Sequence, residues 1–177
     1  RRAAVRPEDA IARLPVPARR LAYRAAHRVL SVWWVVRRPH MRGVKCVLRH
    51  DGHVLFVRHT YGDRTAWELP GGGLRRGEAP ADAAAREARE ELGVHATWTQ
   101  LATIHARGGP KVTTLTVFVA DLPGPGASGP AERDRSGSIA LTIDPGEIAE
   151  ARWAPLDAPP APLAPLARCV VDRLRAG

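Results

Sequence analysis

The chain has 177 residues, of which 45% are hydrophobic and 25% charged, and a formal net charge of +9. This composition is typical of a globular protein and excludes a wholly disordered chain. Its two cysteines, Cys46 and Cys169, lie far apart, so the sequence indicates neither a zinc cluster nor a disulfide framework. Because isolated thiols are typical of a reducing compartment, we expect a cytoplasmic protein.

The excess positive charge is confined to the first quarter of the chain. Residues 1–42 contain eleven arginines against Glu8 and Asp9, which leaves sixteen basic and sixteen acidic side chains in residues 43–177. The sequence therefore predicts a basic extension at 1–42 and a neutral domain at 43–177. Arginine far outnumbers lysine throughout the chain, a pattern that the base composition of a genome can produce without selection for an anionic partner. This explanation accounts for the charge as well as a binding partner does, and no nucleic-acid partner is expected.

Residues 8–38 are predicted to be helical. Apolar side chains in this segment recur near a 3.6-residue period, opposite arginines at positions 20, 24 and 28. The apolar run that contains Trp33 and Trp34 is too short to span a bilayer. Two interpretations remain open: residues 17–38 lie on an anionic membrane, or the helix packs its apolar face on its own domain or on a second subunit.

Beyond the extension, the pattern predicts strands interleaved with helices. A hairpin is expected from strands at 43–49 and 53–59, joined by a turn at Asp51 and Gly52. A helix is expected at 81–92, between Pro80 and Gly93. The remaining predictions are strands at 66–69, 94–106, 112–122, 139–143 and 150–154, a loop at 123–137 and a helix at 163–174. This order predicts an α/β fold with a mixed β-sheet flanked by helices.

The segment from Gly72 to Val94 carries the pattern that indicates chemistry. On the predicted helix Glu87, Glu90 and Glu91 are spaced i, i+3 and i+4, so their carboxylates converge on one face. Like charges so close are costly unless a cation offsets them, and oxygen ligands suit Mg²⁺ or Mn²⁺. Arg86 can pair with Glu90 one turn on, or with Glu78, and so hold the carboxylates in place.

The same segment resembles the Nudix box, the signature of the Nudix hydrolase family. The seven positions that match its single-residue requirements are Gly72, Glu78, Arg86, Glu87, Glu90, Glu91 and Gly93, while Ala88 stands where a larger aliphatic residue is usual. The resemblance runs from Gly43 to about Pro159 and implies an α/β/α sandwich. It implies hydrolysis of a nucleoside diphosphate linked to another moiety, such as a nucleotide sugar, ADP-ribose or a nucleoside triphosphate. It also implies Mg²⁺ or Mn²⁺ as cofactor and a homodimer.

The resemblance further implies roles for individual residues. The metal ligands would be Glu87, Glu90, Glu91 and the backbone of Gly72. The catalytic residues would be Arg86, Glu87, Glu91 and Glu147. Glu87, oriented by Arg86, would accept the proton from the attacking water. Many family members add a carboxylate from a loop ahead of a strand that carries a tryptophan, and Glu147 is the candidate here, with Glu150 as the alternative.

The resemblance implies that residues outside this segment select the substrate. Pro110 stands where some ADP-ribose pyrophosphatases have a proline, but it also follows two glycines in a predicted turn. The residues that could stack on a base or meet phosphates are Tyr61, Trp67 and Trp98, and Arg58, Arg64, Arg107 and Lys111. The alternative function is a non-catalytic Nudix-fold module that senses or binds nucleotides, against which the intact glutamate set argues.

Overall fold

The computed structural model describes residues 14–37, 40–108, 111–122 and 141–176. Within these ranges the elements are α2 (Val16–Arg37), β1 (His40–His50), β2 (His53–His59), α3 (Pro80–Leu92), β3 (Thr99–Gly108), β4 (Lys111–Asp121), β5 (Ile148–Pro155) and α4 (Pro165–Arg175). The strands form one sheet in the order β3-β4-β1-β2-β5. β1 and β4 are parallel and the other neighbours are antiparallel, which confirms the predicted mixed sheet.

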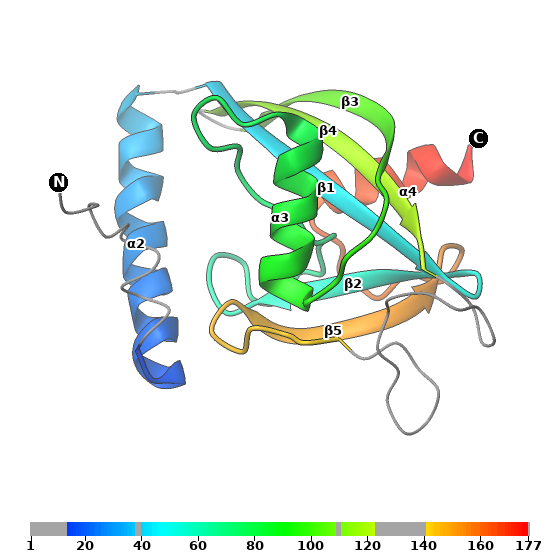
Figure 1. Cartoon of the computed structure of the whole chain (residues 1–177). Coiled ribbons are helices and arrows are strands. Elements are labelled where there is room, and N and C mark those ends of the chain that lie inside the picture. The colour runs from blue at the N-terminus through cyan, green and yellow to red at the C-terminus, as the bar shows by residue number, and fades with distance from the viewer. Residues whose placement is uncertain (1–13, 38–39, 109–110, 123–140, 177) are drawn as a thin grey trace, which may run out of the picture.

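Side chains alternate between two faces of this sheet, and each face is covered by one helix. The face that packs on α4 presents Val47, Phe56 and Val117. The opposite face, under α3, presents Leu48, Leu55 and Phe118. The helices contribute Ala167, Val170 and Val171 from α4, and Ala83, Ala84 and Leu92 from α3. α3 and α4 therefore lie on opposite sides of the sheet (Figure 1), as an α/β/α sandwich requires.

The predicted helix boundaries of α3 are confirmed. Pro80 occupies its first turn, where the missing amide costs nothing, and Gly93 ends it in the left-handed conformation with φ 68°. The amides of Gly93 and Val94 close the helix on the carbonyls of Arg89 (3.0 Å) and Ala88 (3.2 Å). Ala88 is fully buried, so the small side chain lets α3 lie close to the sheet.

Some predicted strands are absent or shorter. Residues 66–69 make isolated bridges, Val57 with Glu68 and Trp67 with Leu163, in place of a strand. β3 begins at Thr99 and not at residue 94, because Val94 closes the end of α3. Residues 141–143 are not a strand, since the Thr142 amide bonds to the carbonyl of Leu92 at the end of α3. The predicted loop at 123–137 and residues 139–140 lie outside the described ranges.

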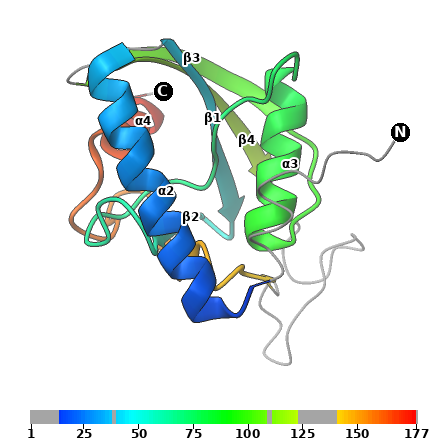
Figure 2. The ribbon, with the colours of Figure 1, turned by 90° about the vertical axis from the view of Figure 1, so that its left-hand side faces the viewer.

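Helix α2 lies beside the layers formed by α3, the sheet and α4, and not on either face of the sheet (Figure 2). It begins at Val16, while residues 8–13 of the predicted helix lie outside the described ranges. It reaches the domain through polar contacts of Arg19, Arg20 and Arg24. Leu21 and Val29, on its apolar face, are 68% and 69% exposed.

Leu21 and Val29 therefore do not pack on the domain, while the choice between a membrane, the domain and a second subunit for the apolar face stays a prediction. The loops beside the helix present carbonyl and carboxylate oxygens, for which arginine is the better partner. No helix in the described ranges has the length and hydrophobicity needed to cross a membrane. The division at residue 42 stays a prediction, although β1 already begins at His40.

Candidate active site

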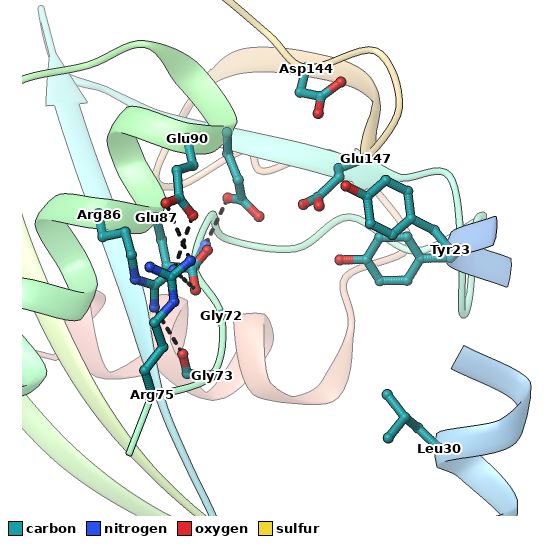
Figure 3. A pocket seen from close by; sticks show the side chains of 13 residues that line it. Tyr23, Leu30, Gly72, Gly73, Arg75, Arg86, Glu87, Glu90, Asp144 and Glu147 are labelled. Atoms are coloured by element: carbon teal, nitrogen blue, oxygen red, sulfur yellow. Dashed lines mark hydrogen bonds and ion pairs between the residues drawn. The ribbon is translucent and has the colours of Figure 1, made fainter. Parts of the chain in front are cut away.

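One pocket of about 690 Å³ brings the three predicted glutamates of α3 together with Arg86, Gly72 and Glu147 (Figure 3). Its lining residues are Tyr23, Leu30, Tyr61, Gly71, Gly72, Gly73, Arg75, Arg86, Glu87, Glu90, Glu91, Asp144 and Glu147. The glutamates of α3 form one wall, and the glycine-rich segment 71–73 lies below them. The loop at 144–147 and helix α2 face this wall from the other side (Figure 3).

Arg86 joins the glutamates of α3 to the loop that precedes the helix. Its Nη1 lies 2.8 Å from Glu87 Oε1 and 3.1 Å from Glu90 Oε2, and its Nε lies 2.7 Å from Glu78 Oε1. Nη2 donates to the carbonyl of Gly73 at 3.1 Å. Hydrogen bonding to Arg86 holds the pKa of Glu78 well below its usual value, at about 2. The buried guanidinium thus fixes three carboxylates relative to one another.

Glu91 is the most deeply buried carboxylate of this wall, with 3% of its surface exposed. Its Oε2 accepts a hydrogen bond of 3.0 Å from the amide of Gly71. Burial, together with the neighbouring Glu87, raises the pKa of Glu91 to about 8. Burial also raises the pKa of Glu87, against the opposing charge of Arg86. The wall therefore carries more negative charge than its surroundings stabilise.

Gly72 lies directly beside the Glu87 carboxylate, and a Cβ at this position would overlap with it. Its carbonyl accepts a hydrogen bond of 2.9 Å from the amide of Val44 in β1. Glycine is therefore required here for steric reasons, because any side chain would displace the Glu87 carboxylate. The predicted role of the Gly72 backbone as a metal ligand stays a prediction.

Glu147 faces this wall across the pocket, and Glu150 does not. Glu147 lies on the loop before β5, where burial raises its pKa and the Tyr23 hydroxyl opposes that change. Glu150 lies on β5 and is ion-paired with Arg58 and Arg152. Of the two candidates for the additional carboxylate, only Glu147 lines the pocket.

The donor set of the pocket matches a hard divalent cation, because five carboxylates line it, those of Glu87, Glu90, Glu91, Asp144 and Glu147. In the ranges that the structure describes, no three His, Cys, Asp or Glu side chains are grouped so as to hold an ion. Glu87 and Glu90 accept from Arg86, and Glu91 accepts from Gly71. Ligation would thus exchange some of these hydrogen bonds for contacts with the cation.

The other predicted substrate contacts divide into those near the pocket and those away from it. Tyr61 lines the pocket. Trp67 is buried in the core, with the guanidinium groups of Arg58 and Arg152 5.1 and 4.9 Å from its ring centre. Trp98 packs against the core under α3, and Arg64 lines a separate hollow. Pro110 and the side chains of Arg107 and Lys111 lie outside the described part of the chain.

Sequence reasoning missed several residues of the facing wall. These are Tyr23, Leu30 and Asp144, and Arg75 was missed as well, on the loop before α3 where it pairs with Glu90. A signal was present in α2, because Arg19, Tyr23 and His27 are spaced i, i+4 and i+8 and share one face. The stripe predicted at 20, 24 and 28 lies on the neighbouring face of the helix and gives no indication of the site.

Comparisons with known proteins agree with this arrangement. A model of the NUDIX domain matches residues 39–174. ADP-ribose pyrophosphatase of Mycobacterium tuberculosis is 46% identical over 87 residues, which cover 46% of this chain and 42% of that protein. The matched segment spans about half the length of such curated relatives.

Solved structures share the fold. The MutT NUDIX hydrolase of Burkholderia pseudomallei has a TM-score of 0.64 at 22% identity, and the match covers 77% of this chain and 98% of that one. The NUDIX domain of Shewanella oneidensis NrtR, in complex with ADP ribose, has a TM-score of 0.61 at 20% identity, covering 80% and 90%. Both are similar to this chain in the arrangement of the sheet and its helices.

Proposed function

The chain belongs to the NUDIX domain family, and from this premise we propose that it hydrolyses the pyrophosphate of a nucleoside diphosphate linked to another moiety, with Mg²⁺ or Mn²⁺ as cofactor. One observation carries the proposal: three glutamates of α3 share a pocket with Glu147 on the facing loop. A pocket of about 690 Å³ is within the range of small-molecule sites, roughly 300–1,000 Å³.

In this proposal Glu87, Glu90 and Glu91 hold the cation, and Arg86 positions two of them. Mg²⁺ in this place would stabilise charge on the phosphate oxygens and lower the pKa of a bound water. Because Arg86 also bonds to Gly73, the carboxylates keep their place relative to the glycine-rich segment. This preorganisation reduces the rearrangement needed when the substrate arrives.

The geometry favours Glu147 over Glu87 as the residue that accepts the proton from water. One oxygen of Glu87 is engaged by Arg86, and the positive charge reduces its basicity. Glu147 faces the α3 wall across the pocket, and burial raises its pKa (Figure 3). The water oxygen then adds to one phosphorus, its proton goes to Glu147, and the bridging P–O bond breaks with its electrons on the leaving phosphate.

We further propose a nucleotide sugar of the ADP-ribose kind as the substrate. The relative from Mycobacterium tuberculosis is an ADP-ribose pyrophosphatase, and the NrtR domain binds ADP ribose. The pocket extends from the carboxylates to Tyr23 and Tyr61, whose rings can pack on a base or a sugar. The cytoplasmic location and the homodimer that the resemblance implies are part of the same proposal.

The test is a nucleotide panel with and without Mg²⁺, with products identified by mass. ADP-ribose should give two phosphate monoesters only when Mg²⁺ is present, while other nucleotide sugars and oxidised triphosphates report the breadth of the site. Glu147→Gln should lower the rate at least about 100-fold. Glu150→Gln is the matched control and should retain activity, because Glu150 lies outside the pocket. Metal-dependent binding without product release would contradict the proposal and indicate a sensing module.

A further inference from the structure

Helix α2 lies outside the segment that the family model matches, yet it holds the loop that carries Glu147. The guanidinium of Arg19 forms an ion pair of 2.9 Å with Asp144. Arg20 Nε donates to the carbonyl of Pro145 at 3.1 Å. The helix thus contacts the two residues at the start of the loop, each through an arginine.

Thr60 connects a third arginine to the same loop. Arg24 Nε donates to the carbonyl of Thr60 at 3.2 Å. The amide of Thr60 in turn donates to the carbonyl of Glu147 at 2.8 Å, and its hydroxyl donates to the carbonyl of Gly146 at 2.5 Å. The loop backbone is therefore held on one side by α2 and on the other by the residue that follows β2.

Tyr23 brings α2 to the Glu147 side chain itself. Its ring centre lies 5.9 Å from that of Tyr61, and Tyr23 and Glu147 line the same pocket. Figure 3 shows Tyr23 and Glu147 together on the wall that faces Glu87 and Glu90. Burial and Glu147 together raise the pKa of Tyr23, which keeps the hydroxyl protonated and able to donate.

We propose that Tyr23 is a positioning residue for Glu147, so that helix α2 completes the active site of the domain. The inference rests on the proposed function, in which Glu147 accepts the proton. A carboxylate that would act as a base needs one fixed orientation, and a phenol that donates to one of its oxygens supplies it. Three arginine contacts place the loop, and the tyrosine places the side chain on it.

Tyr23→Phe tests the proposal, because it removes the hydroxyl and keeps the ring against Tyr61. We expect kcat for ADP-ribose to fall about ten-fold, with KM changed less than about two-fold, as is typical when a supporting hydrogen bond is lost. In the Glu147→Gln background the same substitution should have no further effect, since the two residues act as one unit. Leu21→Ala, on the exposed face of α2, is the control and should keep wild-type kinetics.

A second variant reaches the same loop without touching Tyr23. Arg19→Gln removes the ion pair with Asp144 and should also lower kcat, again without further effect in the Glu147→Gln background. The positioning role would be overturned, and the proposed function left standing, by a wild-type kcat in Tyr23→Phe. The same holds if the fall in kcat of either variant multiplies with the fall caused by Glu147→Gln. An inactive wild-type protein would overturn the proposed function itself. Thermal melting of each variant separates these outcomes from loss of fold.

Discussion

At the scale of single residues, two adjacent glycines exclude side chains for different reasons. Gly71 has φ 132°, and a Cβ there would overlap with the carbonyl of Val44 in β1. A Cβ at Gly72 would meet only the end of the Glu87 side chain. Backbone cannot move without disturbing the sheet, whereas a carboxylate can rotate. The first glycine therefore serves the fold, and the second serves the site.

Alanine at these two positions separates stability from activity. Gly72→Ala should lower the Mg²⁺-dependent rate by about 100-fold, because it displaces Glu87, while the melting temperature stays near that of the wild type. Gly71→Ala should destabilise the fold by at least about 1 kcal/mol, through its φ and its clash with β1. Thermal melting and steady-state rates of both variants check this prediction. It would be contradicted if Gly72→Ala lowered the melting temperature as much as Gly71→Ala does.

The Glu91 carboxylate should lower the free energy of unfolding of the metal-free protein, although activity requires it. Its side chain is almost fully buried, and this burial, together with the charge of Glu87, raises the pKa of Glu91 to about 8. Glu91→Gln keeps an oxygen for the Gly71 amide and removes the charge, so we expect a higher melting temperature than for metal-free wild type, and no turnover. Mg²⁺ should raise the melting temperature of the wild type and not that of the variant. A variant that melts lower than the wild type in EDTA would contradict this.

At the scale of elements, α3 and the loop before it behave as one unit because Arg86 joins them. Hydrogen bonds of 2.7 and 3.0 Å from Arg86 depress the pKa of Glu78 to about 2, from an ordinary value of 4.5. A carboxyl group whose pKa is depressed by folding stabilises the folded state at pH values above its ordinary pKa. This stabilisation is lost as the pH falls through the pKa that the group has in the folded state.

Acid titration tests this unit. The free energy of unfolding should fall between pH 4.5 and about 2, and Glu78→Gln should remove part of that fall. Asp157→Asn is the control for a general effect of removing one carboxylate, since Asp157 is exposed and far from Arg86 in the fold. Urea denaturation at several pH values measures the difference. An identical acid response in Glu78→Gln and the wild type would show that the pair adds no stability.

The sequence predicted those elements whose signals are local. Pro80 and Gly93 bound α3, the i, i+3 and i+4 spacing placed three glutamates on one wall, and the turn at 51–52 gave the first hairpin. The predicted strands were wrong at residues 94–98 and 141–143, where the amides of Val94 and Thr142 bond to the last turn of α3 and not to a neighbouring strand. The face that α2 turns to the domain depends on a loop more than a hundred residues away, which no local pattern reports.

At the scale of the whole molecule, α2 exposes two large apolar side chains, Leu21 and Val29. Leu21 and Val29 are exposed on the helix whose arginines contact the domain, which supports the proposed membrane contact through residues 17–38. We expect the full chain to sediment with anionic phosphatidylserine vesicles and Leu21→Ser/Val29→Ser to do so less. Neutral vesicles are the control. Equal sedimentation of both proteins would contradict the membrane contact. A molecular mass in solution that rises with protein concentration would indicate a dimer instead.

The ion pair between Arg19 and Asp144 joins residues separated by 125 positions in the chain. During synthesis at roughly 5–20 residues per second, α2 leaves the ribosome on the order of ten seconds before the loop that it holds. The carboxylates of α3 are likewise synthesised before the loop that faces them. A chain that stops before residue 144 lacks Asp144 and Glu147 of the pocket, and it also lacks β5 and α4, which complete the sheet and its core.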